Sequence, residues 1–224
     1  LYTGNGSTQS LTGVGFQSDW TWIKERSSTS SHVVVDAVRG VSKVIRPNET
    51  SAESTDADVI TSFDSDGFSL GADVKSNENS QTYASWNWKG GGTGSSNSDA
   101  TGSYPISSTV SANTTAGFSI VKYTGNGYST ATIGHGLGVK PSHIMIKSRS
   151  SGTTGWYNYH STLTASDVVH LNSNSGTNAN STVWNNTEPT SSVFSIGTNT
   201  GVNTNGDNYI AYCFAEKTGY SKFG

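Results

Sequence analysis

Charge, cysteine and long apolar runs are scarce in this chain of 224 residues. Charged residues make up 13% of it and the formal net charge at pH 7 is −3, so no surface for a nucleic acid is expected. No run of about 18 apolar residues is present, so we expect no membrane insertion. Cys213 is the single cysteine, which excludes an internal disulfide, and its alternating apolar neighbours predict a buried, unreactive thiol.

Helix signals are scarce as well, since no segment sustains apolar residues at a spacing of three and four. Much of the remainder is Gly, Ser, Thr and Asn, interleaved with seven Phe, six Trp and ten Tyr. Aromatic and β-branched residues between small turn-forming residues are typical of short strands and many turns. The sequence therefore predicts an all-β fold. In the first part of the chain we expect strands over 9–16, 19–26, 31–38, 41–46, 58–63 with 66–71, and 81–88.

One pattern occurs twice along the chain, in the same order. Tyr-Thr-Gly-Asn-Gly begins each copy, an alternating segment ending in Lys-x-Arg-Ser-Ser follows, and a longer block closes it. These three blocks lie at 2–6, 24–28 and 67–88 in the first copy, and at 123–127, 147–151 and 193–214 in the second. The repeat predicts two structurally related units.

We therefore predict two tandem β-sandwich repeats of jelly-roll-like form, 1–88 and 118–224, packed together. A Gly/Ser/Thr-rich linker, 89–117, is expected between them. The alternative is one composite β-sandwich to which both copies contribute. A sandwich of about 100 residues is marginally stable alone, so we expect the copies to pack on each other or the chain to form a homo-oligomer.

The repeat also separates two kinds of aromatic residue. Aromatics found at the same place in both copies are expected in a common core, and these are Trp86, Trp88, Tyr212 and Phe214. Aromatics present in one copy only are candidates for a binding site, because aromatic faces stack on sugar rings. The candidate glycan-binding residues are Trp156, Tyr157, Asn158, Tyr159, His160 and Trp184. The alternative is that Tyr157 and Tyr159 face the core while Trp156 closes an edge.

Catalytic patterns are lacking in this sequence. The five histidines are dispersed, with no pair at zinc-binding spacing, and neither a phosphate-binding loop nor a nucleophile elbow occurs. We expect no enzymatic activity and assign no catalytic residue. Asp64 and Asp66 form a short calcium-like cluster, so calcium is the one cofactor considered, although most ligands of a full calcium loop are missing.

Six blocks carry a resemblance to a known family. They read GFQSDWTWIKERSS, DAVRG, FDSDGFSLG, VSANTTAGFSIVKYTGNG, GHGLGVKPSHIMIKSRS and YIAYCFAEKTGYSKFG. Together they resemble a domain common in tailed bacteriophages, especially marine ones, within proteins described as tail fibres or other virion structural components. Members often show Trp-Cys-Trp where this chain has Trp86-Asn87-Trp88. No catalytic or binding residues of that family are available to carry over.

The resemblance implies a viral protein at the virion surface, outside the cell, with other virion proteins as partners. Three functions follow as hypotheses. The first is a tail-fibre or surface-adhesion module that binds host surface glycans. The second is a purely architectural protein, a fibre spacer or a decoration of capsid or tail, with no ligand. The third, least favoured, is a polysaccharide depolymerase, which would need a deep acidic cleft.

Overall fold

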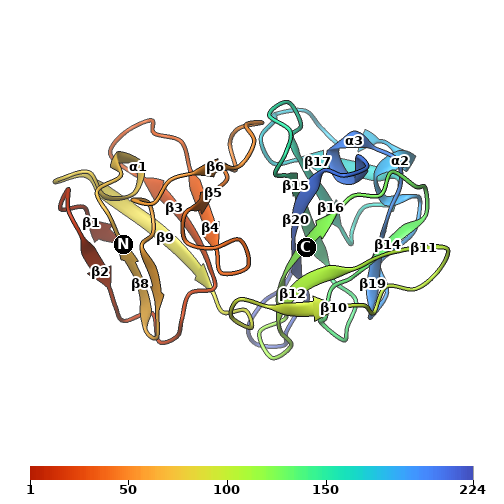
Figure 1. The fold of residues 1–224 in the computed structure, drawn as a ribbon, viewed down its shortest axis with the longest axis horizontal. Coiled ribbons are helices and arrows are strands. Elements are labelled where there is room, and N and C mark those ends of the chain that lie inside the picture. The colour runs from red at the N-terminus through yellow and green to blue at the C-terminus, as the bar shows by residue number, and fades with distance from the viewer. Residues whose placement is uncertain (224) are drawn as a thin grey trace.

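The computed structural model describes residues 1–223 and shows an all-β protein, which confirms the fold class predicted from the sequence. Strands make up 39% of the chain and helices 5%, and several antiparallel sheets are arranged as in a β-sandwich. The first half of the chain, red to yellow in Figure 1, lies beside the second half, green to blue.

The first half consists of two antiparallel sheets and a two-stranded pair. Its elements are β1 (Tyr2–Thr3), β2 (Gln9–Leu11), β3 (Trp20–Glu25), β4 (Val33–Asp36), β5 (Lys43–Val44), β6 (Ser54–Thr55), β7 (Ser62–Asp64), β8 (Gly67–Leu70), α1 (Val74–Asn77) and β9 (Thr82–Trp88). The larger sheet has the order β1-β9-β3-β4, the smaller one β2-β8-β7, and β5 pairs with β6. Each strand predicted here overlaps an observed strand, but most are shorter, β7 shares only residues 62–63 with the predicted 58–63, and β1 and β6 were not predicted.

The second half consists of a long sheet and a short one. Its elements are β10 (Ser95–Asn97), β11 (Tyr104–Ile106), β12 (Ser108–Asn113), β13 (Phe118–Thr124), β14 (Ala131–Gly134), β15 (His143–Ser148), β16 (Trp156–His160), β17 (Asp167–His170), β18 (Asn178–Ala179), α2 (Ser181–Trp184), β19 (Val193–Ile196), α3 (Thr200–Asn203) and β20 (Asn208–Phe214). The long sheet has the order β10-β12-β13-β20-β15-β16-β17-β18 and the short one β11-β14-β19, in which β11 and β14 are parallel.

The predicted linker, 89–117, is not a linker over most of its length. It contains β10, β11 and β12, and β12 pairs with β13 from Ser108↔Tyr123 to Asn113↔Phe118. Ile106 and Val110 from this segment are buried in the core of the second half. Its Gly, Ser and Thr residues suggested a loop, but a sheet edge offers backbone hydrogen bonds to any sequence that can extend beside it.

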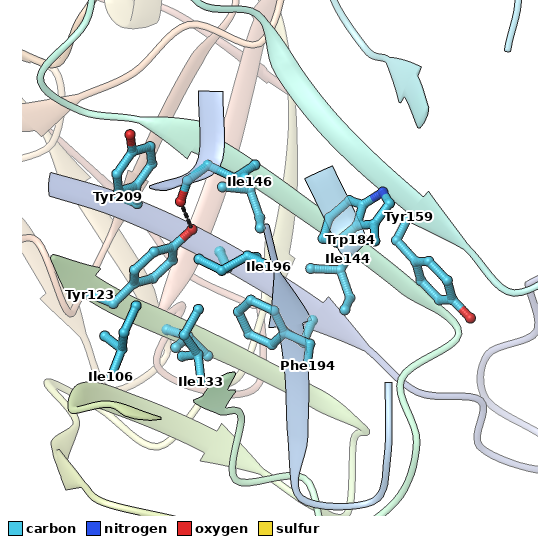
Figure 2. Close-up of a cluster of buried hydrophobic side chains, with 14 of the residues drawn as sticks. Ile106, Tyr123, Ile133, Ile144, Ile146, Tyr159, Trp184, Phe194, Ile196 and Tyr209 are labelled. Atoms are coloured by element: carbon cyan, nitrogen blue, oxygen red, sulfur yellow. Dashed lines mark hydrogen bonds between the residues drawn. The ribbon is translucent and has the colours of Figure 1, made fainter. Parts of the chain in front are cut away.

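Strand alternation divides the side chains of β20 between two cores. Tyr209, Ala211 and Cys213 face the core of the second half, which Figure 2 shows with Tyr123, Phe194 and Trp184 around it. Cys213 is fully buried there and burial raises the pKa of its thiol to about 12, so the predicted buried thiol is confirmed.

The opposite face of β20 belongs to a central core between the two halves. Ile210, Tyr212 and Phe214 pack there with Trp20 of β3 and Val34 of β4. A third core lies within the first half, where Ile23, Val35, Phe68, Leu70 and Tyr83 are buried. The two larger sheets therefore face each other across the central core, and each covers its own smaller sheet on the other side.

Polar groups also join the halves. The Arg39 guanidinium contacts Asp36 at 2.5 Å, and the Tyr212 hydroxyl donates to the same carboxylate at 2.7 Å. Nearby, the Arg149 Nε donates to Glu53 at 2.7 Å, and the Trp156 Nε1 donates to the Arg46 carbonyl at 3.0 Å. These contacts fix the orientation of one half on the other.

The two halves share a strand order. In the first half β1, β9, β3 and β4 are neighbours, and in the second β13, β20, β15 and β16 stand in the same order. Tyr2 lies opposite Tyr83 as Tyr123 lies opposite Tyr209, and both ring pairs are stacked at 5.0 and 5.2 Å. The shared strand order and the stacked tyrosine pairs agree with the predicted tandem repeat. The repeat itself stays a prediction from the sequence.

The repeated Tyr-Thr-Gly-Asn-Gly has a structural role that explains its tyrosine, its first glycine and its asparagine. The Tyr123 hydroxyl donates to the Val202 carbonyl (2.9 Å, dashed in Figure 2). A Cβ at Gly125 would lie 2.4 Å from the Thr204 carbonyl oxygen, so only glycine fits. The Asn126 N–H donates to Oδ1 of the buried Asn203. The first half repeats these contacts with Tyr2, Ser76, Gly4, Glu78, Asn5 and Asn77.

Candidate functional site

A cleft lined with aromatic side chains opens between the two halves, at one end of the central core. Its volume is about 530 Å³. Its walls are formed by Trp20, Trp22, His32, Trp86, Trp88, His143, Met145, Phe214 and residues 220–223. We call it the Trp cleft. Its lining is mainly apolar and includes four tryptophans, so it is our candidate site.

Strand register places four tryptophans on one face of the sheet. Trp20 lies directly opposite Trp88, and Trp22 lies directly opposite Trp86, in the antiparallel pair of β3 and β9. Residues two apart on a strand point to the same face, so all four indoles project toward the second half. The rings meet edge to face, with centroids 4.9 Å apart for Trp20 and Trp88 and 6.2 Å apart for Trp22 and Trp86.

The packing between the halves covers only part of this row. Trp20 is buried against Phe118, Tyr212 and Phe214. Trp22 and Trp88 are half-buried, and the Trp86 side chain is 47% exposed. The prediction that Trp86 is a core residue is therefore wrong, because the apolar contact with the second half ends before it. Trp88, Tyr212 and Phe214 do pack in or against the central core.

Polar groups stand among the aromatic walls. The Trp22 Nε1 donates to His32 Nδ1 at 2.8 Å, which leaves the Nε2 of this histidine as its remaining polar atom. Burial lowers the pKa of His32, and the charge of Lys24 lowers it further. Lys222 is exposed on the segment that borders the cleft. The cleft thus combines flat apolar rings with hydrogen-bonding groups, and none of its lining residues within 1–223 is a carboxylate.

His143 forms part of the floor and is held neutral. Burial lowers its pKa to about 4, opposed by the hydrogen bond with the Tyr159 carbonyl and assisted by nearby His160. Its Nδ1 lies 2.9 Å from that carbonyl and therefore carries the proton, and its ring stacks on Phe223. A charged imidazolium is unfavourable in this position.

This burial predicts a loss of stability in mild acid. The unfolded chain takes up a proton at His143 below its ordinary pKa of about 6.5, whereas the folded chain does so only near pH 4, so stability falls as pH decreases through this window. Between pH 7 and pH 5 we expect a loss of about 2 kcal/mol from this group. Urea unfolding at both pH values, for the protein and for His143→Gln, measures it. Equal losses in the two proteins would contradict the assignment.

The glycan-binding residues predicted from the sequence lie elsewhere. Trp156 is 1% exposed and stacks on Tyr212 in the central core, while Trp184 is 1% exposed in the core of the second half. Tyr159 packs edge to face on Trp184, and its hydroxyl donates to Glu188. These rings form no exposed platform, so the prediction that they bind a sugar is corrected. Aromatic residues unique to one copy turned out to be needed for packing.

The rest of that segment is also engaged within the protein. Tyr157 is half-buried against His170, with ring centroids 4.7 Å apart. Asn158 is buried and its Nδ2 donates to the Val169 carbonyl. His160 interacts through Nδ1 with the Thr162 hydroxyl. The alternative considered from the sequence is correct for Tyr157 and Tyr159, which face the core of the second half, but Trp156 packs within the central core instead of closing an edge.

Asp64 and Asp66, the candidate calcium ligands, have separate hydrogen-bonding partners. The Asp66 carboxylate accepts the N–H groups of Gly13 and Gly15, and these bonds lower its pKa. Asp64 accepts the hydroxyls of Ser62 and Ser69. Within residues 1–223, no three or more His, Cys, Asp or Glu residues gather as a metal ion would require. Calcium binding at this hairpin stays a prediction from the sequence.

The signal for the Trp cleft was present in the sequence. Trp20 and Trp22 are two apart, as are Trp86 and Trp88, so each pair had to share a strand face. What the sequence lacked was the register between the two strands and the extent of the contact between the halves. Without these, the sequence does not distinguish a row of tryptophans that the second half covers completely from a row that is partly open to solvent.

An all-β protein with an aromatic cleft between two similarly ordered sheets is thus the class that the fold and site define. The whole chain, residues 1–224, matches the model of a family described as Domain of unknown function (DUF7483), and the chain belongs to this family. No curated protein and no solved structure matches it. Across residues 1–223, none of the helices has the length and apolar character needed to cross a membrane.

Proposed function

We propose that this chain is a surface-adhesion module of a phage virion and that it binds host surface glycans in the Trp cleft. The observation that carries the proposal is the row of four cross-strand tryptophans, of which Trp22, Trp86 and Trp88 remain open to solvent. A large apolar surface left uncovered on a folded protein is typical of a binding site. The assignment to a virion rests on the family resemblance in the sequence.

The chemistry of the cleft suits a sugar. Indole faces present flat apolar surface at low cost in side-chain entropy, and the C–H faces of pyranose rings stack on such surfaces. The His32 imidazole, the Lys222 ammonium and the Tyr220 hydroxyl are among the hydrogen-bonding groups that line the cleft and could reach sugar hydroxyls. Among the described residues that line the cleft there is no pair of carboxylates, which a depolymerase would need for acid–base hydrolysis, so we favour binding over cleavage.

Binding of the fluorescently labelled protein to an array of bacterial surface polysaccharides tests this proposal. We expect saturable binding to at least one polysaccharide, and at least about a tenfold loss of affinity in Trp86→Ala, the size expected when an aromatic anchor is truncated. The matched control is Tyr128→Ala, which removes an aromatic side chain that is 54% exposed outside the cleft, and it is expected to bind as the unchanged protein does.

Circular dichroism should show the same fold in both variants. Equal losses in the two variants would move the site away from the cleft. No binding at all, even when the protein is presented as an oligomer on beads, would contradict glycan binding and favour the architectural role. Immunogold labelling of intact virions with an antibody to the chain tests the location separately.

A further inference from the structure

A second cleft adjoins the Trp cleft on the second half. Its volume is about 480 Å³. Strands β15, β16 and β17 supply part of its lining, and Leu163, Leu171 and Thr177 line it from the loops beside these strands. We call it the His cleft. His143 lines both the Trp cleft and the His cleft, so the two clefts lie next to each other.

Strand register makes the lining of the two clefts continuous. On β15, His143 and Met145 line the Trp cleft. Directly opposite them on β16 stand His160 and Asn158, which line the His cleft. Val169 of β17 stands opposite Asn158 and lines the His cleft too. Directly opposed side chains of antiparallel strands are neighbours, and the rings of His143 and His160 have centroids 5.9 Å apart. One surface therefore runs from the Trp cleft across three strands.

Polar groups along this surface have unused hydrogen-bonding capacity. Asn158 is 5% exposed, and its Oδ1 has no hydrogen-bond partner within residues 1–223. The Nδ1 atoms of His143 and His160 are both engaged within the protein, which leaves the Nε2 of each ring for a ligand. A buried acceptor without a donor is unfavourable, and the hydroxyls of a sugar are donors of the kind that these groups lack.

The rest of the His cleft is apolar and carries no formal charge. Leu171 is 41% exposed, and Leu163 and Val169 are half-buried. Among the described residues that line this cleft, none is Asp, Glu, Lys or Arg. The carboxylate of an acidic sugar would find no cation to pair with there. The His cleft therefore suits the apolar face and the hydroxyls of a neutral sugar unit.

We propose that the Trp cleft and the His cleft form one extended site, which binds the interior of a polysaccharide chain and holds a neutral sugar unit in the His cleft. This inference rests on the proposed function and adds that the ligand is a run of several sugar units. The two clefts have volumes of about 530 and 480 Å³, each within the range of a pocket that holds a small molecule. A single terminal sugar would occupy only one of them.

The dependence of affinity on chain length tests the inference. The probes are fragments of the polysaccharide that binds best on the array, made by partial hydrolysis and separated by length from disaccharides to octasaccharides. Isothermal titration calorimetry measures their affinities for the protein. We expect the affinity to rise by at least about tenfold with length, because contacts in the second cleft add to those in the first, and then to stay constant once both clefts are filled.

Two variants locate the added contacts. Leu171→Ala should weaken the binding of the longest fragments by about fivefold, from the lost burial of part of this side chain, and should leave the affinity for disaccharides unchanged. Trp86→Ala should weaken fragments of every length. The matched control is Val139→Ala, which truncates an aliphatic side chain that is 42% exposed outside both clefts and should bind as the unchanged protein does.

The results that would overturn the inference are distinct from failure of the proposed function. Equal affinity for fragments of all lengths, with a loss in Trp86→Ala, would leave the Trp cleft as the glycan site and overturn the extended site. A rise with length that Leu171→Ala and Val139→Ala share equally would place the added contacts outside the His cleft and would also overturn it. No binding by any fragment or by the intact polysaccharide would contradict the proposed function and this inference together.

Discussion

Replacement of Arg39 by leucine is expected to lower the free energy of unfolding by about 3–5 kcal/mol, because it leaves a buried carboxylate without its cation. The Arg39 side chain has no exposed surface, and its Nε contacts Asp36 Oδ2 at 2.5 Å. Its Nη1 reaches Glu53 at 3.2 Å, and Nη2 donates to the Val34 carbonyl. Burial opposes the charge of Arg39, but Asp36, Tyr212 and Glu53 favour it and keep its pKa high.

Urea unfolding followed by tryptophan fluorescence measures this effect. The matched control is Lys140→Met, which removes a cation from the pair with Glu188, whose side chains are 47% and 46% exposed. An exposed pair contributes less than about 1 kcal/mol, so this variant should remain close to the unchanged protein. Similar losses in the two variants would show that the Arg39 network does not hold the halves together.

The second large effect is expected at Asn203, where replacement by alanine should cost about 2–4 kcal/mol. Oδ1 of this buried residue accepts the Asn126 and Gly127 N–H groups at 2.9 and 3.2 Å. Its Nδ2 donates to the Tyr128 and Gly197 carbonyls, both at 2.8 Å. Removal of the amide leaves these backbone groups without their partners, and thermal or urea unfolding measures the loss.

The first half offers an internal comparison for this prediction. The Asn77 side chain accepts the Asn5 N–H and donates to the Gly71 carbonyl in the same way. Asn77→Ala should therefore lower the free energy of unfolding by a similar amount. Asn205→Ala, at an exposed turn position, serves as the control and should change stability by less than about 0.5 kcal/mol. If Asn203→Ala matched this control, the repeated pentapeptide would need another explanation.

Much of the first half could be predicted from its sequence. Alternating apolar residues bounded by Gly40, Pro47 and Asp66-Gly67 placed the strands, because turn residues and a period of two are local properties. Strands β10, β11 and β12 were missed for the converse reason. Their sequences extend because each has a neighbouring strand, β12 beside β10, β14 beside β11 and β13 beside β12, and that pairing is set by the tertiary structure rather than by the local sequence.

The site was harder to predict, because a difference between the two copies can mark either a binding site or a contact between the two halves. Trp156 lacks an aromatic counterpart in the first copy, yet it is buried where the two halves meet, so asymmetry between copies marked the interface instead of a ligand site. Trp86 has the counterpart Tyr212, yet only Tyr212 is covered. Equivalent positions share a strand and a face, but their burial depends on the packing of one half on the other.

The measurement that tests the account most directly is a side-chain NMR titration of the tryptophan indole N–H signals with the polysaccharide that binds best on the array. We expect the signals of Trp22, Trp86 and Trp88 to shift in proportion to bound ligand, and those of the buried Trp156 and Trp184 to remain in place. Saturable binding with no shift at Trp22, Trp86 or Trp88 would contradict the Trp cleft as the glycan-binding site.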